Sequence, residues 1–373
     1  MKYFSQSHNR GQNLRPPDLY EYFVDNFWFR AADLENQKIN EPLRGSHKAD
    51  IVIIGGGYTE TGMLGVAMND KQVRALVEHR DELKSFGLDS SLLQGKELEA
   101  EIKSPLFTAG LNIPYGATLN PAKLAREMKR VVEEVGVEVR ERTVVTQIMP
   151  GKVNIVDTEL GDIRVPILVI ALNAYGHKLG FFKDRVFPVS VFQIATEPLT
   201  KAQWESIGWA NRQGLFDLRA LFSYSVITAD GRIVMGGSDF TYYDNDALSS
   251  GNDKTVTQRI IDNLFAFFPQ LKGLQIEHAW GGTTAYTLGR IPSVGVIGDH
   301  QNIYFGTGFN EGVPSAQTAG RIIADLMAGE ENEYTDHFIV NRKIPYAGPN
   351  RLRGLFGRGV KWMMKNWGYS PIH

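Results

Sequence analysis

The sequence predicts a protein of the α/β class, and three observations carry this prediction. The first is an apolar, β-branched run at 51–54 that ends on three consecutive glycines. The second is a helix-like segment at 120–135, which leads toward a further apolar run at 167–172. The third is a series of alternating and aromatic runs between residues 181 and 284, a pattern typical of antiparallel strands. Strands joined by helices indicate a parallel sheet, and the alternating runs indicate a second, mixed α+β layer.

The glycines that end the first run suggest a phosphate site. Gly55, Gly56 and Gly57 follow a strand whose two faces are both apolar, as in a buried parallel sheet. Glycine lets the backbone turn sharply and approach a ligand phosphate, and the N-terminus of a following helix favours the negative charge. Glu60, however, stands where a dinucleotide fingerprint has its third glycine. The segment therefore predicts a Rossmann-like phosphate site with only the first half of its fingerprint.

Composition limits the classes of function. A chain of 373 residues with 43% hydrophobic content can bury a large core, and we expect more than one domain. The net charge of -2 argues against bulk nucleic-acid binding, and the absence of cysteine excludes disulfides, thiolate metal sites and a cysteine nucleophile. No apolar run approaches the roughly 20 residues that cross a bilayer, and the N-terminus is too polar for a secretory signal. We expect a cytoplasmic protein without a nucleic-acid partner, a transmembrane segment or a metal centre.

The segment after the glycines admits two interpretations. In the first, residues 61–68 form a strand and Asp70 caps a helix over 71–86. In the second, residues 58–70 form the first Rossmann helix, and Glu78 ends the next strand as the acid that binds a ribose hydroxyl. Helical spacing persists for four turns over 71–86, which favours the first interpretation.

The pattern becomes clearer from residue 120. Asn120 and Pro121 are expected to cap and open an amphipathic helix through Val135. Its inward stripe consists of Leu124, Met128, Val131 and Val132. Strand material then follows at 137–148, at 152–165 as a hairpin, and at 167–172 as a buried strand. A helix between buried strands predicts a parallel sheet.

The second half of the chain changes character and then repeats the opening pattern. Residues 181–284 predict an antiparallel sheet with one helix at about 256–268. From residue 302 an apolar strand runs into glycines and a helix expected over 315–327. The N-terminus of that helix is expected to point at the ligand of the first glycine loop.

Several of these segments together resemble a known family. The matching segments are Asp50–Thr59, Asn120–Leu124, Val169–Tyr175, Thr196–Pro198, Asp230–Gly237, Trp280-Gly281, Gly289–Pro292 and Gly306–Gly312. They are similar to the FAD-dependent amine and amino-acid oxidoreductases of the D-amino-acid oxidase/glycine oxidase class, and most like the γ-glutamylputrescine oxidoreductase-like members. Each segment alone is unspecific, and the combination is specific.

The resemblance implies a domain organisation. An N-terminal arm at 1–46 precedes a discontinuous FAD-binding domain at 47–60, 120–180 and 285–330, a substrate domain at 61–119 and 181–284, and a basic tail at 331–373. In the family, the segment matching Thr61–Ala67 lies far downstream of the glycine loop, in the substrate domain. The rest of the first helix, the second strand and a flavin-packing motif are therefore missing here. The resemblance thus implies a Rossmann-like FAD-binding domain that is truncated, beside a mixed substrate domain.

The resemblance also implies the chemistry and the site residues. FAD takes a hydride from the carbon that bears the amine, and Arg290 pairs with a substrate carboxylate. The implied cofactor-binding residues are Gly55, Gly56 and Gly57 at the pyrophosphate, Val144 and Ala171 beside the adenosine half, and Gly306, Gly308 and Gly312 near the flavin ring. Tyr224 and Trp280 are candidate pocket walls, although large aromatic side chains more often belong to a core. For Arg290 the alternative is a structural ion pair.

Other interpretations remain open. Because part of the FAD-binding region is missing, the chain is alternatively a non-catalytic or weakly FAD-binding relic of the family. A nicotinamide dehydrogenase is disfavoured by the absent third glycine. After Asp336 the tail contains basic and apolar residues but no acid. Such a helix can make peripheral membrane contact or dock on its own protein, and its glycines favour docking.

Overall fold

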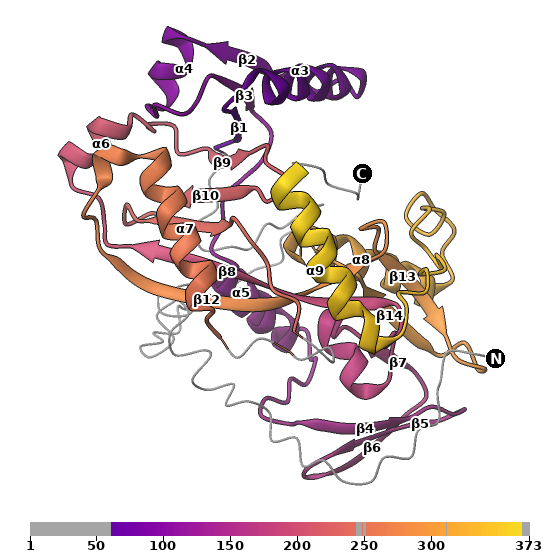
Figure 1. Ribbon diagram of the computed structural model, residues 1–373. Helices are drawn as coiled ribbons and strands as arrows, with labels where there is room; N and C mark the ends of the chain where they lie inside the picture. The colour runs from indigo at the N-terminus through magenta and orange to yellow at the C-terminus, as the bar shows by residue number, and fades with distance from the viewer. Residues whose placement is uncertain (1–60, 244–247, 249–250, 311, 368–373) are drawn as a thin grey trace.

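The computed structural model describes residues 61–243, 248, 251–310 and 312–367. Over these residues the fold is mixed α/β, which confirms the predicted class (Figure 1). The arm at 1–46 and the glycine loop Gly55–Gly57 lie outside the described residues. Among the described helices, none combines the length and the apolar character needed to cross a bilayer.

The strands are β1 (Met63–Ala67), β2 (Ser91–Gln94), β3 (Ala109–Ile113), β4 (Val145–Met149), β5 (Asn154–Thr158), β6 (Gly161–Val165), β7 (Leu168–Ile170), β8 (Val186–Thr196), β9 (Gly214–Asp217), β10 (Ser223–Ile227), β11 (Ile233–Gly237), β12 (Ile276–Thr287), β13 (Ser293–Ile297) and β14 (Ile303–Thr307). The α-helices are α3 (Asp70–Ser85), α4 (Lys96–Glu101), α5 (Pro121–Glu134), α6 (Lys201–Ile207), α7 (Lys254–Phe267), α8 (Gly312–Ala328) and α9 (Asn350–Trp367), with short 3-10 helices η1 (Asn173–Leu179) and η3 (Pro269–Leu271).

The large sheet has eight strands in the order β12-β8-β11-β10-β9-β1-β3-β2. Its neighbouring strands are antiparallel except for β1 and β9, which are parallel. The antiparallel sheet predicted for 181–284 is confirmed. β1 joins this same sheet, so the segment after the glycines contributes to the layer formed by the second half of the chain.

Residues 61–86 form a strand followed by a helix, as the favoured interpretation predicts. The alternative, in which 73–78 form a strand ending at Glu78, is wrong because these residues lie inside α3. The predicted cap Asp70 is also wrong. Asn69 is the cap, since its extended backbone lets its side chain accept a hydrogen bond from the Gln72 amide at 3.1 Å.

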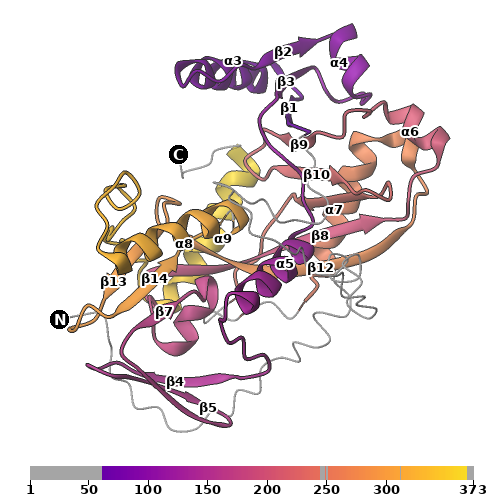
Figure 2. The same cartoon turned by 180° about the vertical axis from the view of Figure 1, so that it is seen from behind.

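The two faces of the large sheet have different partners. Figures 1 and 2, which view the molecule from opposite sides, show α7 on one face and α5 on the other. Successive side chains of a strand point to opposite faces. On β8, Phe192 and Ile194 are fully buried in the core cluster that includes Ile260 and Leu264 of α7. Val191 and Gln193 face the opposite side, where they line a cavity.

The small sheet has the order β13-β14-β7, with β13 antiparallel and β7 parallel to β14. α8 packs on β13 and β14. The buried strand predicted for 167–172 is wrong over most of its length, because β7 is short and Val169 is 43% exposed. β7 is the edge strand among the described residues, and Ile170 is its buried member.

The third sheet, β4-β5-β6, is an antiparallel meander that contains the predicted hairpin. The helix predicted from Asn120 is confirmed as α5, and the Asn120 side chain accepts hydrogen bonds from two amides of the first turn, each at 3.0 Å. Of the strand material predicted over 137–148, the part before β4 is not a strand. That part is rich in charged residues and mostly exposed, and it has no neighbouring strand among the described residues.

Of the remaining helices, some were predicted from the sequence and others were not. α7 confirms the helix predicted at 256–268, and α8 begins at Gly312 rather than at 315. α6 was not predicted, although Thr200 and Gln203 form a capping box at its start. α9 packs on the protein: Arg353 is 2% exposed, and its guanidinium donates to the Lys183 carbonyl at 2.7 Å. The structure therefore supports the docked-helix interpretation of the tail and does not support a membrane contact.

Candidate active site

A cavity of about 2260 Å³ lies on the face of the large sheet opposite α7. Its walls come from the sheet, from α5 and from residues of α3, α8 and α9. The predicted inward stripe of α5 lines this cavity rather than a closed core. Small-molecule pockets usually measure about 300–1,000 Å³. The cavity is therefore large enough for a small substrate together with a much larger second molecule.

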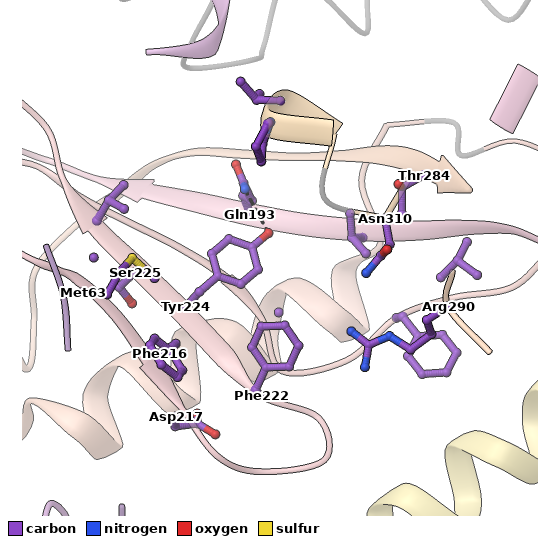
Figure 3. Close-up of a pocket in the computed structure, with 18 of the residues that line it drawn as sticks. Met63, Gln193, Phe216, Asp217, Phe222, Tyr224, Ser225, Thr284, Arg290 and Asn310 are labelled. Atoms are coloured by element: carbon purple, nitrogen blue, oxygen red, sulfur yellow. Dashed lines mark hydrogen bonds between the residues drawn. The ribbon is translucent and has the colours of Figure 1, made fainter. Parts of the chain in front are cut away.

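Tyr224 and Gln193 form a polar pair on the floor of the cavity (Figure 3). Gln193 Nε2 donates to Tyr224 Oη at 3.0 Å. The Tyr224 ring lies against Gly236, where a Cβ atom would approach Tyr224 Oη to 2.5 Å, so only glycine permits this packing. Burial raises the pKa of the Tyr224 phenol above its ordinary value of 10.0. Near neutral pH the phenol keeps its proton and can donate it to a ligand.

Arg290 lines the same cavity, in the turn between β12 and β13. Its backbone is left-handed, with φ +57°, and its amide donates to the Thr287 carbonyl at 3.0 Å. Such a φ is uncommon outside glycine. Within the described part of the chain, the Arg290 guanidinium makes no hydrogen bond or ion pair. Figure 3 shows Arg290 and Asn310 directed into the cavity near Tyr224.

The second glycine loop joins β14 to α8 and is held by side chains from two other elements. Asn173 clamps the Phe309 backbone: its Nδ2 donates to the Phe309 carbonyl at 3.0 Å, and its Oδ1 accepts from the Phe309 amide at 3.2 Å. Thr284 Oγ1 donates to the same carbonyl at 2.9 Å. Gly308 has φ +82°, and a Cβ there would lie 2.6 Å from Thr287 Cγ2. The loop is therefore fixed relative to the sheet.

The N-terminus of α8 opens on the cavity. Val313 and Pro314 of its first turn line the wall, and no atom of the described residues lies within 4 Å of a Cβ built on Gly312. The free N–H groups and the positive dipole end of such a terminus favour anionic or electron-rich groups.

Two carboxylates at the cavity wall, Asp217 and Asp239, are paired with cations. Asp217 accepts from the Arg219 guanidinium at 2.7 Å and from the Ser223 amide at 2.9 Å. The Asp239 side chain is fully buried; it pairs with Lys361 at 2.7 Å and also with Arg259. Glu78 and Glu82 of α3 also line the cavity, so the preference for an anionic ligand group comes from the Arg290 guanidinium itself.

The other predicted site residues occupy varied places. Gly306 is buried within β14, where a Cβ would meet Phe309 at 3.0 Å. Val144 and Ala171 are exposed, and neither lines the cavity. Of the two candidate wall aromatics, Tyr224 lines the cavity, and Trp280 belongs to a core cluster with Ala195 and Val234. The ligand roles assigned to these residues stay predictions.

Sequence reasoning missed three contributors to the cavity. Gln193 is a polar residue between the apolar residues Phe192 and Ile194 of a strand, which was a usable signal. Asn310 lies between the predicted glycines Gly308 and Gly312, two residues from each, and was likewise a usable signal. The contribution of α9 had no local signal. Over the described residues, no group of three or more His, Cys, Asp or Glu side chains is placed to hold a metal ion.

Known sequences are similar to this chain over most of its length. The family model for FAD dependent oxidoreductases (DAO) matches residues 52–326. The γ-glutamylputrescine oxidoreductase of Escherichia coli (strain K12) is 31% identical over 299 residues, which cover 79% of this chain and 68% of the relative. The probable oxidoreductase OrdL of Haemophilus influenzae is 27% identical over 301 residues, covering 78% and 66% respectively. The chain thus spans about two thirds of the length of these relatives.

Solved structures share the fold. The glycine oxidase of Geobacillus kaustophilus superposes with a TM-score of 0.67 at 18% identity, covering 78% of this chain and 76% of that chain. The L-proline dehydrogenase of P. horikoshii gives a TM-score of 0.66 at 19% identity, covering 81% and 78% respectively. The predicted resemblance is confirmed: the chain belongs to the FAD dependent oxidoreductase (DAO) family.

Proposed function

We propose that the protein is an FAD-dependent oxidoreductase that oxidises an amine or amino acid by hydride transfer from the carbon bearing the nitrogen. The observation that carries the proposal is the cavity itself. Arg290, whose guanidinium has no partner among the described residues, faces the same space as the Tyr224–Gln193 pair and the N-terminus of α8. One substrate can therefore contact an anion site and a hydroxyl donor at once.

The described residues fit the ring-bearing part of FAD. The cavity volume exceeds what a small amine needs, and the space beside Gly312 is open. The Asn173 clamp holds the neighbouring loop in place. Residues 312–314 would lie beside the flavin, and Gly55–Gly57, outside the described residues, would hold the pyrophosphate. FAD, when bound, supplies the hydride acceptor.

Each cavity residue has a definite task in this proposal. Arg290 binds a substrate carboxylate, for which a planar guanidinium is suited. Tyr224 stays protonated and donates a hydrogen bond to the substrate, and Gln193 fixes the orientation of its hydroxyl. The apolar side chains around them exclude water from the reacting carbon.

The names of the relatives support an amine or amino acid as the substrate class. They include a γ-glutamylputrescine oxidoreductase, glycine oxidases and a fructosyl peptide oxidase. A cytoplasmic location, the domain boundaries and the adenosine contacts of Val144 and Ala171 stay predictions from the sequence.

The visible spectrum of the purified protein tests the proposal. We expect a yellow protein with flavin absorption that bleaches when an oxidisable amine is added without oxygen. The second candidate is the non-catalytic or weakly FAD-binding relic, which is favoured by Glu60 at the third glycine position and by the direct run from the glycine loop into β1. A protein that stays colourless after incubation with excess FAD would support the relic and contradict the enzyme.

A further inference from the structure

Helix α9 lies outside the region that the family model matches, which ends at residue 326. Even so, Gly357, Val360 and Met364 of α9 line the cavity. Their spacing of three and four residues places them on one face of the helix. The tail therefore builds part of the candidate active site.

Two cations fix α9 in this position. Near its start, Arg353 donates to the Gly348 carbonyl at 3.1 Å and to the Lys183 carbonyl at 2.7 Å. Farther along, Lys361 Nζ lies 2.7 Å from Asp239 Oδ1 and donates to the Phe240 carbonyl at 2.8 Å. Since the Asp239 side chain is fully buried, this ion pair anchors the cavity-facing turn of the helix.

The wall that α9 completes is apolar. Val360 and Met364 supply its side chains, and Phe187, Phe240 and Tyr242 line the adjoining part. Gly357 packs against Tyr242, since a Cβ on Gly357 would lie 3.5 Å from the Tyr242 Cβ. Lys361 and Asp239 neutralise each other at the edge of this wall. This part of the cavity wall therefore suits a hydrocarbon group of a ligand, whereas the cationic Arg290 suits an anionic group.

We infer that α9 determines substrate specificity: Val360 and Met364 contact the hydrocarbon part of a substrate whose carboxylate is held by Arg290. The inference rests on the proposed function, because it names the substrate class of the same site. The helix sets the length of the apolar chain that the cavity accepts. The ligands predicted to bind best are therefore carboxylates with a long aliphatic or aromatic chain.

Binding of straight-chain carboxylates tests this without turnover, since they lack the amine. We would titrate the FAD-loaded protein with acetate, butyrate, hexanoate and octanoate by calorimetry. Burying one methylene contributes about 0.8 kcal/mol, or about a fourfold gain in affinity. In Met364→Trp the larger side chain shortens the cavity, so octanoate binding should weaken about tenfold and acetate binding should stay within about twofold of the parent.

Two further variants sharpen the test. Leu355→Trp is the matched control, because Leu355 is on the same helix, is 60% exposed and does not line the cavity; it should keep the parent profile. Met364→Ala guards against misfolding of the Trp variant and should weaken octanoate about fivefold by removing apolar contact.

The outcomes separate the two proposals. Unchanged chain-length profiles in both Met364 variants would overturn the role of α9 and leave the flavin spectrum, and with it the proposed function, intact. A colourless protein would overturn the proposed function, and the same titration of the FAD-free protein would still decide whether α9 contacts the ligand chain. Equal affinity for acetate and octanoate in the parent would overturn the inference directly.

Discussion

The large sheet and the small sheet differ in how completely they are covered. The large sheet buries one face under α7, and its other face lines the cavity. On the small sheet, the edge strand β7 leaves Val169 43% exposed, and the preceding Ile167 is 45% exposed. The large sheet thus has one fully covered face, whereas the small sheet leaves apolar side chains at its edge strand exposed. We therefore expect most of the folding free energy to come from the large sheet.

Truncating one isoleucine of the large sheet and one beside the small sheet gives the largest expected difference in the free energy of unfolding. Ile194→Ala removes a fully buried side chain of β8 and should lower the free energy of unfolding by about 4 kcal/mol. Ile167→Ala, beside β7, should lower it by less than about 1 kcal/mol because its side chain is already partly in water. Urea unfolding measures both values, and equal losses would contradict the comparison.

Asp239 tests how firmly α9 is attached to the large sheet. Asp239→Asn leaves Lys361 and Arg259 without their carboxylate and should cost about 3 kcal/mol of unfolding free energy. Asp184→Asn is the control: that side chain is 55% exposed and its ion pair is long, so the cost should stay below about 0.5 kcal/mol. A similar, small cost for both variants would show that the Asp239 pair does not anchor the helix.

Substitutions of Arg290 test ligand binding in the cavity rather than the stability of the sheet beneath it. Arg290→Met should weaken carboxylate binding about thirtyfold, since a charge-assisted hydrogen-bonded pair contributes about 2 kcal/mol. Binding of an amine without a carboxylate should change little, and Arg290→Lys should recover part of the loss. If carboxylates and simple amines weaken equally, Arg290 has a structural role instead.

Asp325 gives the smallest expected effect and probes α8, the helix that covers the small sheet. Hydrogen bonds from Arg321 and Asn332 hold the pKa of its carboxyl below the ordinary value of 3.8. A carboxyl with a lowered folded pKa stabilises the fold above the unfolded pKa, and this stability is lost as the pH falls through the folded pKa. Arg321→Met should therefore reduce the loss of stability as the pH falls through the unfolded and then the folded pKa of Asp325, as measured by urea unfolding.

Local structure was predictable wherever the signal was local. Asn120 and Pro121 marked the start of α5 because capping and the fixed φ of proline act within one turn. The prediction of a buried strand at 167–172 failed for the converse reason. An apolar run reports the preference of a segment for burial, but burial also needs a covering element, and Val169 stays 43% exposed in the structure. The cap of α3 failed by one position because Asn69 and Asp70 are chemically similar.

The site was predictable in part. Arg290 came from the family resemblance, and its place in the cavity agrees with that expectation without testing its role. Tyr224 and Trp280 look alike in sequence, and only the packing separates the wall residue from the core residue. The contribution of α9 depends on contacts between residues far apart along the chain, which no periodicity or motif records.

The pairing of Asp239 with Lys361 has a consequence for biosynthesis. The ribosome synthesises every described strand before it reaches α9. Until then, a nascent chain has a cavity that lacks one wall and a carboxylate that lacks one of its two cations. Arrival of the last described helix therefore both finishes the binding site and removes an exposed apolar surface that chaperones would otherwise recognise.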